Sequence, residues 1–140
     1  MLRHLNQIWR LFLLQNSRNE KTLDGLGFLH VLAPRFPDRS EGAAANEEFA
    51  RRHGGYFNAN PVLASYIAGV VTNLEMRRRN GEDVPPERVD RIKNALAAVL
   101  TARGDYFFDV ILLPLGLTIG SIFAIHTSYF GPVLFLALYN

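Results

Sequence analysis

The 140-residue chain contains no cysteine, which excludes disulfides, thiolate metal sites and a cysteine nucleophile. Its four histidines are far apart, and no two of them have the i, i+4 spacing of a helical metal site. The sequence also lacks the GxSxG, HExxH, Walker A and GxGxxG patterns, and nothing organises its Ser, His and Asp residues into a triad. We therefore expect no catalytic residue, no metal and no cofactor in this chain.

An excess of one charge is also missing. Lys and Arg number 15 against 13 Asp and Glu, a net charge of +2, which is too balanced to indicate a nucleic-acid partner. All of these charges precede Val110, and residues 110–140 contain none. This asymmetry predicts two regions, an amphipathic helical region at 1–109 and a hydrophobic membrane region at 110–140.

The first residues predict an amphipathic helix and no cleavable signal peptide, because the apolar run Leu11–Leu14 is too short for one. Apolar residues recur at helical spacing and form one face: Leu2, Leu5, Ile8, Trp9, Phe12 and Leu13. Arg3 and Arg10 lie off this face. Two interpretations are open, a helix on a membrane surface and an ordinary packed helix.

The middle of the chain predicts two further helices and a loop. A short apolar segment opens at Gly25 and is followed by a loop over Arg35–Gly42 and a helix over Ala43–Arg52. The next helix starts at Asn60-Pro61, because Asn caps free N–H groups and Pro has none to lose.

The apolar part of that next helix, Val62–Leu74, would rise only ~20 Å, short of the ~30 Å hydrocarbon core of a bilayer. It is therefore either a core helix or a segment that enters the membrane without crossing it. The Arg77-Arg78-Arg79 triplet after it is either a solvated helix end or a cytoplasmic anchor.

The last part of the chain predicts membrane segments. A helix starts near Pro86 and ends at Gly104-Asp105, and one membrane helix follows near Phe107–His126. Gly131-Pro132 predicts a turn before a second apolar helix, which reaches Asn140 with too little length to span a bilayer. The expected fold class is an all-α membrane protein, with amphipathic or re-entrant helices followed by a C-terminal hydrophobic transmembrane region. We expect the chain to be truncated or continued by another polypeptide.

Polar side chains near the predicted helix starts are the candidate binding residues. They are Gln15, Ser17 and Asn19, then Asn58 and Asn60, then Asp105 and Asp109. Amides suit sugar hydroxyls because they donate and accept hydrogen bonds at once. A carboxylate at membrane depth is energetically costly, and it is therefore a candidate for a functional residue. The alternative is that Asn58, Asn60 and Asp105 only cap helices.

Several motifs resemble one family over nearly the whole chain. They include Tyr56-Phe-Asn58, Asn60-Pro61 and Gly69-Val-Val71, with Gly25-Leu-Gly27-Phe28 upstream and Gly104-Asp105 downstream. Further matches are Arg10, Phe12, Gln15, Ser17, Asn19, His53, Leu74-Glu75, Leu112-Leu-Pro114 and Gly131-Pro132. In this order they resemble the IID component of mannose-family (mannose, fructose, sorbose) sugar phosphotransferase systems (PTS).

The resemblance implies a subunit of a bacterial inner (plasma) membrane permease. Such a chain pairs with a IIC subunit in an oligomeric complex and helps to bind and translocate a hexose by alternating access. Phosphoryl transfer would belong to the IIB and IIA phosphocarriers. The residues expected to contact the sugar are Gln15, Asn19, Asn58 and Asp105, and Met1–Leu14 and the tail would contact the partner or form the scaffold.

The chain also departs from the family. The family's glycine-rich G-P-L-A-G-I-G-D-S segment becomes Ala98–Tyr106, which loses two glycines and a proline and gains Arg103. The family's glutamate and arginine in W-N-Y-E-R are replaced by Lys21 and Thr22, and the family chain is about twice as long. These departures favour an alternative, a diverged and non-transporting PTS-like interaction or regulatory protein in the membrane. A soluble helical domain with a buried tail is disfavoured by the uncharged C-terminal region.

Overall fold

The computed structural model describes residues 2–36, 42–127 and 130–139, which are helical apart from turns and isolated backbone bridges. The all-α prediction is confirmed. Two compact units make up the chain, Met1–Thr101 and Ala102–Asn140. Most of the predicted loop after Arg35, with Pro37, Asp38 and Ser40, lies outside the described residues, as do Ser128 and Asn140. The division at 109/110, which was drawn from charge, remains a prediction about the membrane.

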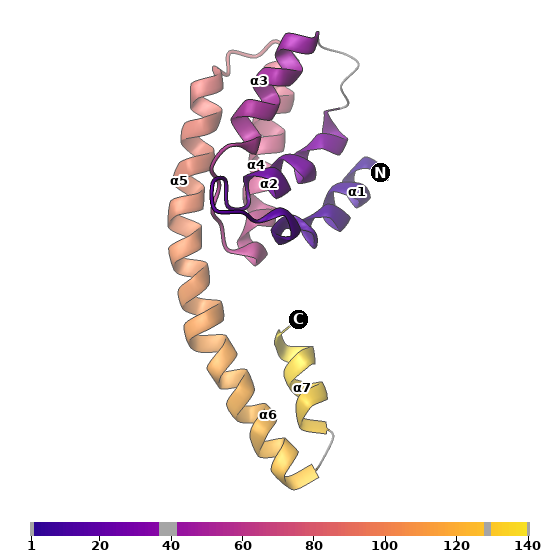
Figure 1. Ribbon diagram of the computed structural model, residues 1–140, viewed down its shortest axis with the longest axis vertical. Helices are drawn as coiled ribbons and strands as arrows, with labels where there is room; N and C mark the ends of the chain where they lie inside the picture. Colours follow the sequence, from indigo (N-terminus) through magenta and orange to yellow (C-terminus); the bar gives the residue numbers. More distant parts are fainter. Residues whose placement is uncertain (1, 37–41, 128–129, 140) are drawn as a thin grey trace. The chain divides into compact units, whose positions relative to one another are not determined.

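The first unit is a cluster of short helices around α2 (Figure 1). Its elements are α1 (Leu2–Leu11), η1 (Leu14–Ser17), α2 (Gly25–Leu32), η2 (Ala33–Arg35), α3 (Ala43–Gly54), α4 (Pro61–Arg79) and the start of α5 (Pro86–Asp105). Phe28 on α2 is fully buried and stacks on Phe57 with ring centroids 4.1 Å apart. The core therefore forms where α2 meets the connection between α3 and α4.

Close backbone approach explains the two glycines of α2. A Cβ on Gly25 would collide with the carbonyl group of Gly55, and a Cβ on Gly27 would collide with the backbone of Leu14. Glycine is required at both positions because only a missing side chain allows backbones this near.

The start of α4 is as predicted. Asn60 Oδ1 accepts a hydrogen bond from the Val62 backbone N–H at 3.2 Å, and Pro61 occupies the first helical position. Ala64, Ile67 and Val71 are fully buried along one side of the helix. The apolar part of α4 is therefore a packed core helix of the first unit, which supports the first of the two interpretations.

Helix α1 packs through its polar side. Gln7 Nε2 donates to Thr72 Oγ1 at 2.8 Å, and Arg10 Nη1 donates to the His30 carbonyl at 2.9 Å. Leu11 packs against the core, whereas the predicted apolar face carries exposed Trp9 and Phe12. The helix is thus both packed and amphipathic, but its apolar face points away from the unit that holds it.

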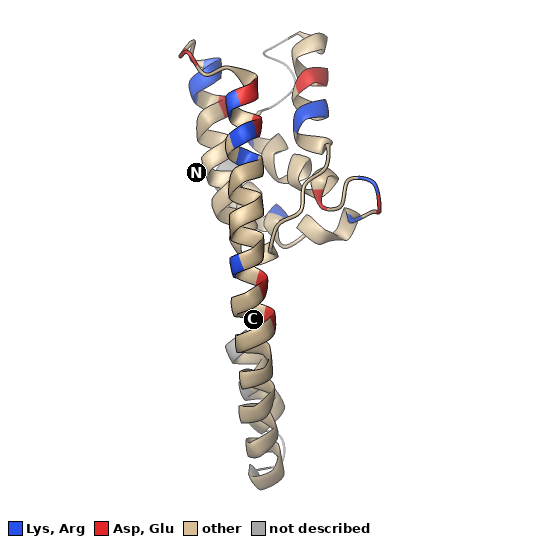
Figure 2. Cartoon of the chain, turned by 90° about the vertical axis from the view of Figure 1, so that its left-hand side faces the viewer, with Lys and Arg blue, Asp and Glu red and all other residues tan. Residues whose placement is uncertain are grey.

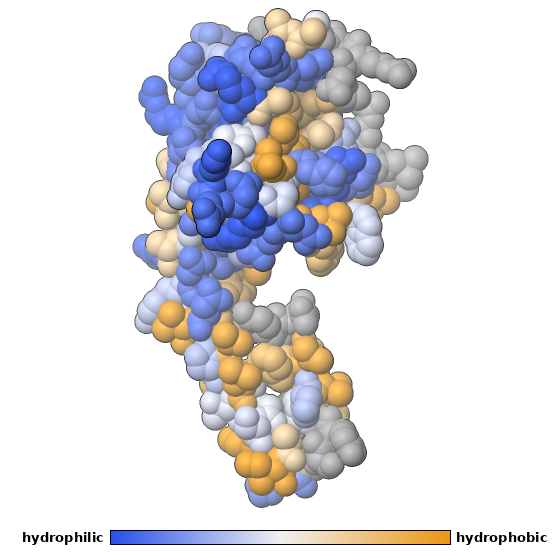
Figure 3. Space-filling model, in the orientation of Figure 1, coloured by the Kyte–Doolittle hydropathy of each residue, from blue (hydrophilic) through white to orange (hydrophobic). Residues whose placement is uncertain are grey.

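The second unit is a helical hairpin. Its elements after the end of α5 are the π-helix η3 (Tyr106–Leu112), α6 (Leu113–Thr127) and α7 (Phe130–Tyr139), and α6 and α7 lie side by side (Figure 1). Among the described residues, one helix is long and apolar enough to cross a membrane, and it runs from Pro86 to His126. It contains the predicted membrane helix near 107–126. No charge follows Asp109, and the surface of this unit is largely apolar (Figures 2 and 3).

Two predicted breaks are not where the sequence placed them. Helix α5 ends at Asp105 as predicted, but no break follows, because the helix continues as the π-helix η3, and Asp105 has helical angles (φ −59, ψ −42) with no capping hydrogen bond from its side chain. The prediction that Asp105 caps the next helix is therefore wrong. Gly131-Pro132 does not form the turn either, since both residues lie in the first turn of α7, where a proline loses no hydrogen bond.

Candidate functional site

Two of the predicted sugar-binding amides lie near Leu23, which takes part in two backbone bridges. Leu23, with φ +48, pairs with Asn19 on one side and with Phe57, the neighbour of Asn58, on the other. The Asn19 side chain donates to Thr22 Oγ1 at 2.7 Å and accepts from the Lys21 and Thr22 backbone N–H groups at 3.0 and 2.9 Å. The Asn19 side chain therefore stabilises the 19–23 turn through these three hydrogen bonds.

Asn58 is linked to a buried carboxylate through an arginine. Arg18 Nη2 donates to Asn58 Oδ1 at 3.4 Å, and Arg18 Nη1 contacts Asp24 Oδ2 at 3.3 Å. Burial raises the pKa of Asp24, and the charge of Arg18 opposes that shift. The Asn58 carbonyl accepts a hydrogen bond from Thr101 Oγ1 at 3.1 Å, so this residue joins three segments of the first unit. It does not cap a helix; that role belongs to Asn60.

The other two predicted site residues are exposed. Gln15 lies in η1, where its carbonyl accepts from the Arg18 backbone N–H, and its side chain is at the surface. Asp105 belongs to the second unit, and Gln15, Asn19 and Asn58 to the first. The structure therefore brings two of the four residues near Leu23: Asn19, which is bridged to it, and Asn58, which is next to its other partner, Phe57.

A buried charged cluster, which sequence patterns did not predict, joins α3, α4 and α5. Glu75 on α4 receives hydrogen bonds at Oε1 from Arg52 Nη1 at 2.5 Å and His53 Nε2 at 2.9 Å, and its Oε2 lies 3.3 Å from Arg78 Nη1. Lys93 on α5 donates to the Arg52 carbonyl at 2.7 Å. Because all four of Arg52, His53, Glu75 and Lys93 are buried, the cluster fixes the three helices to one another.

Burial and pairing set the protonation states in this cluster. Burial lowers the pKa of His53, so its imidazole is neutral. Burial alone would raise the pKa of Glu75, but the hydrogen bond from His53 and the positive charge of Arg52 together bring it down to about 2. Within the part of the chain that the structure describes, buried His53 Nδ1 has no hydrogen-bond partner. A neutral imidazole with its proton on Nε2 therefore explains both the hydrogen bond to Glu75 and the lack of a partner at Nδ1.

The contacts of this cluster join three helices of the first unit. Among the residues the structure describes, no group of three or more His, Asp or Glu is placed to hold a metal ion. Both acidic oxygens of Glu75 are taken up by cations, so it is not free to act as a base. His53 and Glu75 both stand in the motif quoted above, but their spacing of 22 residues gave no local signal that they touch.

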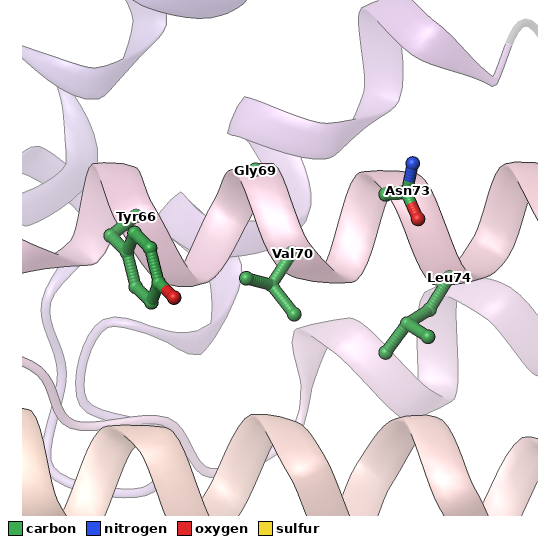
Figure 4. A pocket seen from close by; sticks show the side chains of 5 residues that line it. All are labelled: Tyr66, Gly69, Val70, Asn73 and Leu74. Atoms are coloured by element: carbon green, nitrogen blue, oxygen red, sulfur yellow. The ribbon is translucent and has the colours of Figure 1, made fainter.

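An apolar groove lies along one side of α4 (Figure 4). Its lining residues are one helical turn apart: Tyr66, Gly69, Val70, Asn73 and Leu74. The groove has a volume of about 400 Å³, and Gly69 leaves it open because a Cβ there would meet no other atom within 4 Å. Asn73 is its one amide. A shallow, apolar groove of this kind suits a helix better than a sugar.

The arginine triplet at the end of α4 contacts residues of its own unit. Arg77 pairs with Glu82 at 2.6 Å, Arg78 with Glu75, and the Arg79 guanidinium lies 4.5 Å from the centre of the Phe36 ring. These contacts hold the helix end in place. The cytoplasmic location of the triplet remains a prediction.

Comparison with known proteins gives a consistent result. The profile of the PTS system mannose/fructose/sorbose family IID component matches residues 3–140. The PTS system mannose-specific EIID component of Escherichia coli K12 is 33% identical over 132 residues, which cover 91% of this chain and 46% of that protein. The fructose permease IID component of Bacillus subtilis is 25% identical over 138 residues, or 96% of this chain and 50% of that one. The chain spans about half the length of these relatives.

Solved structures show the same fold. A chain of the mannose transporter ManYZ, determined by cryo-electron microscopy with microcin E492, superposes with a TM-score of 0.91 at 30% identity. The superposition covers 100% of this chain and 52% of that one. A second structure, described only as a membrane protein, has a TM-score of 0.89, also at 30% identity.

Proposed function

This chain belongs to the mannose/fructose/sorbose family of PTS IID components, and on that premise we propose that it helps a IIC-type subunit to bind and translocate a hexose. The phosphoryl group would reach the sugar from IIB and IIA partners, because no residue of this chain is expected to carry it. The complex would lie in the bacterial inner membrane. The observation that carries the proposal is the family match over residues 3–140 together with the ManYZ-like fold.

The surface of the chain supports a role as one subunit among several. In the second unit Leu115, Ile122 and Ile125 are exposed, as expected of a helix that contacts lipid or another membrane helix. In the first unit, the apolar groove along α4 is a surface to which a partner helix can bind. We propose the groove and the α6–α7 hairpin as the surfaces that meet the IIC-type partner.

The polar residues support a sugar contact at Asn58. Its amide is partly exposed, and its bond to Arg18 is long at 3.4 Å, so a sugar hydroxyl can compete for the same oxygen. Gln15, exposed in η1, and Asp105, exposed in the second unit, are proposed as further contacts. Asn19 is proposed to hold the 19–23 turn, which pairs with Phe57 next to Asn58, since its own side chain is already bonded.

The test is uptake of labelled hexoses by bacteria that lack their own mannose-type permease. The chain is co-expressed with IIC- and IIB-type subunits, either alone or with the part of the E. coli relative that the match leaves uncovered. Uptake in either arrangement would support transport. Asn58→Ala should then weaken sugar affinity about 2- to 10-fold, the worth of one neutral hydrogen bond. Asn80→Ala, in the exposed turn after α4, is the matched control and should leave uptake unchanged.

Asp105 can be tested in the same assay. If its carboxylate contacts the sugar, Asp105→Asn should weaken affinity roughly 10- to 100-fold at equal membrane levels. Asp109→Asn, one turn further along, is the control. Strong uptake that is indifferent to the Asp105 substitution would remove this residue from the site.

One observation favours the second candidate, an interaction or regulatory protein that does not transport. The stretch 98–106, which resembles a glycine-rich segment of the family, is helical here, and Arg103 adds a permanent charge to it. A complex that assembles with the IIC-type partner but takes up no hexose in either arrangement would support this candidate. Uptake would exclude it.

A further inference from the structure

Four large apolar side chains stand on the outer face of α1 and just after it. Leu5, Ile8, Trp9 and Phe12 are 55, 54, 72 and 76% exposed, and the Trp9 and Phe12 rings meet edge to face at 5.7 Å. Leu13 and Leu26, both partly exposed, extend the patch. An exposed apolar patch of this size is typical of a surface that contacts a membrane or another protein.

The contacts of α1 prevent this face from turning inward. Gln7 and Arg10 are bonded to α4 and α2 on the opposite side, and Leu11 packs on the core. Rotating the apolar face toward the unit would break both hydrogen bonds. The exposed face is therefore a fixed property of the folded unit.

The charge around the patch indicates what covers it. Arg3, Arg10 and Arg18 precede the first acidic residue, Glu20, so the segment that bears the patch carries only positive formal charges, of which Arg10 donates to the His30 carbonyl and Arg18 pairs with Asp24. A basic segment with an exposed tryptophan and a broad apolar face complements an anionic lipid surface, where the aromatic ring lies near the headgroups. A protein partner would be expected to place acidic residues against the same segment.

We propose that α1 lies at the interface of an anionic phospholipid bilayer, with Leu5, Ile8, Trp9 and Phe12 at the boundary between headgroups and acyl chains. The polar side of α1 then faces the first unit and ties it to the membrane surface. This proposal does not depend on sugar transport, because it concerns only the surface that α1 presents.

Trp9 is the only tryptophan of the chain and reports its own depth. The full chain is reconstituted into vesicles of phosphatidylglycerol and phosphatidylcholine with acyl chains brominated near the headgroup or near the bilayer centre. We expect blue-shifted Trp9 emission, stronger quenching by the shallow bromines than by the deep ones, and weak quenching by aqueous acrylamide. Replacing phosphatidylglycerol with phosphatidylcholine should weaken the shallow quenching.

A moved reporter supplies the control. Trp9→Phe combined with Asp83→Trp places the only tryptophan in the charged, exposed turn before α5, where acrylamide should quench it and lipid should not. In a second variant Ile8→Glu puts a charge on the patch and should increase the access of acrylamide to Trp9. Helical content measured by circular dichroism verifies that each variant folds.

Four results would overturn the proposal in whole or in part. Trp9 that is quenched by acrylamide and not by lipid would place the patch in water. Shielding from both quenchers would mean that protein covers it, a partner subunit or a second copy of the chain. Quenching that is strongest at the bilayer centre would mean that the helix inserts across the membrane. Quenching by the shallow bromines that does not depend on phosphatidylglycerol would exclude the proposed attraction of the basic segment to anionic lipid.

Discussion

His53 Nε2 donates a hydrogen bond to Glu75 Oε1 at 2.9 Å, and neither side chain is exposed to solvent. The bond joins α3 to α4 inside the first unit, where Arg52 supplies the positive charge that the carboxylate needs. A buried carboxylate with fixed partners is costly to disturb, because removing one member leaves the others unpaired in a medium of low dielectric constant.

Glu75→Gln should therefore destabilise the first unit strongly. The change leaves buried Arg52 with only the more exposed Glu48 carboxylate as its counter-charge, and we expect a loss of about 3 kcal/mol in unfolding free energy. Thermal unfolding in detergent, followed by circular dichroism, measures it. The matched control is Glu82→Gln, which removes the exposed pair with Arg77 and should cost at most about 1 kcal/mol. Equal effects of the two variants would contradict the assigned role.

Acid should destabilise the first unit in two steps. Burial holds the pKa of His53 below 6.5, so the unfolded chain takes up a proton below pH 6.5 before the folded chain does, and stability falls. Glu75, with a pKa of about 2 in the folded chain against 4.5, adds a second loss as the pH falls from 4.5 toward 2.

The His53 step can be isolated with His53→Gln, whose amide can still donate to Glu75 and does not titrate. The melting temperature of the wild type should fall between pH 7 and 5, and that of the variant should change less. An identical pH profile for both proteins would show that His53 does not contribute.

Gly131→Ala should separate α7 from α6. A Cβ at this position would lie 2.8 Å from Ala124 Cβ and would collide with the Gly120 carbonyl. Both helices would have to move apart and lose their packing. We expect faster proteolysis of the C-terminal segment in detergent. Gly69→Ala is the control, because a Cβ there meets open space and should change nothing.

Asn60→Ala should lower stability by about 1 kcal/mol, through loss of the cap at the start of α4. Asn60→Asp keeps an oxygen acceptor and should recover most of that loss. Both are measured by thermal unfolding. A cost that Asp does not recover would mean that another interaction of Asn60 dominates.

Local signals predicted the helix boundaries that depend on neighbouring residues. Asn60-Pro61 begins α4 because both the cap and the proline act on the next two residues. Gly104 did not interrupt the long helix, which continues past the end of α5 at Asp105, since a glycine costs a helix only about 1 kcal/mol. Gly131-Pro132 fits a helix start as well as a turn, and sequence alone does not separate the two.

Contacts between residues far apart in the sequence could not be predicted from local sequence patterns. Periodicity identified the two faces of α1, but Gln7 and Thr72, 65 residues apart, decide which face packs. Likewise Arg52 and Lys93 look like ordinary surface charges until α3, α4 and α5 come together and bury them. Of the four candidate site residues, the structure brings Asn19 and Asn58 near the two bridges of Leu23, and their contact with sugar remains a prediction.

The bridge at Leu23 also has a consequence for synthesis of the chain. Leu23 has a positive φ, which is unfavourable for a residue with a branched side chain, and its partners include Phe57, 34 residues further along. At about 5–20 residues per second, a ribosome needs roughly 2–7 s to add those residues. The turn before α2 therefore stays unpaired on its Phe57 side until the connection between α3 and α4 leaves the exit tunnel. Until then, Phe28 also lacks Phe57, the ring on which it stacks in the folded unit.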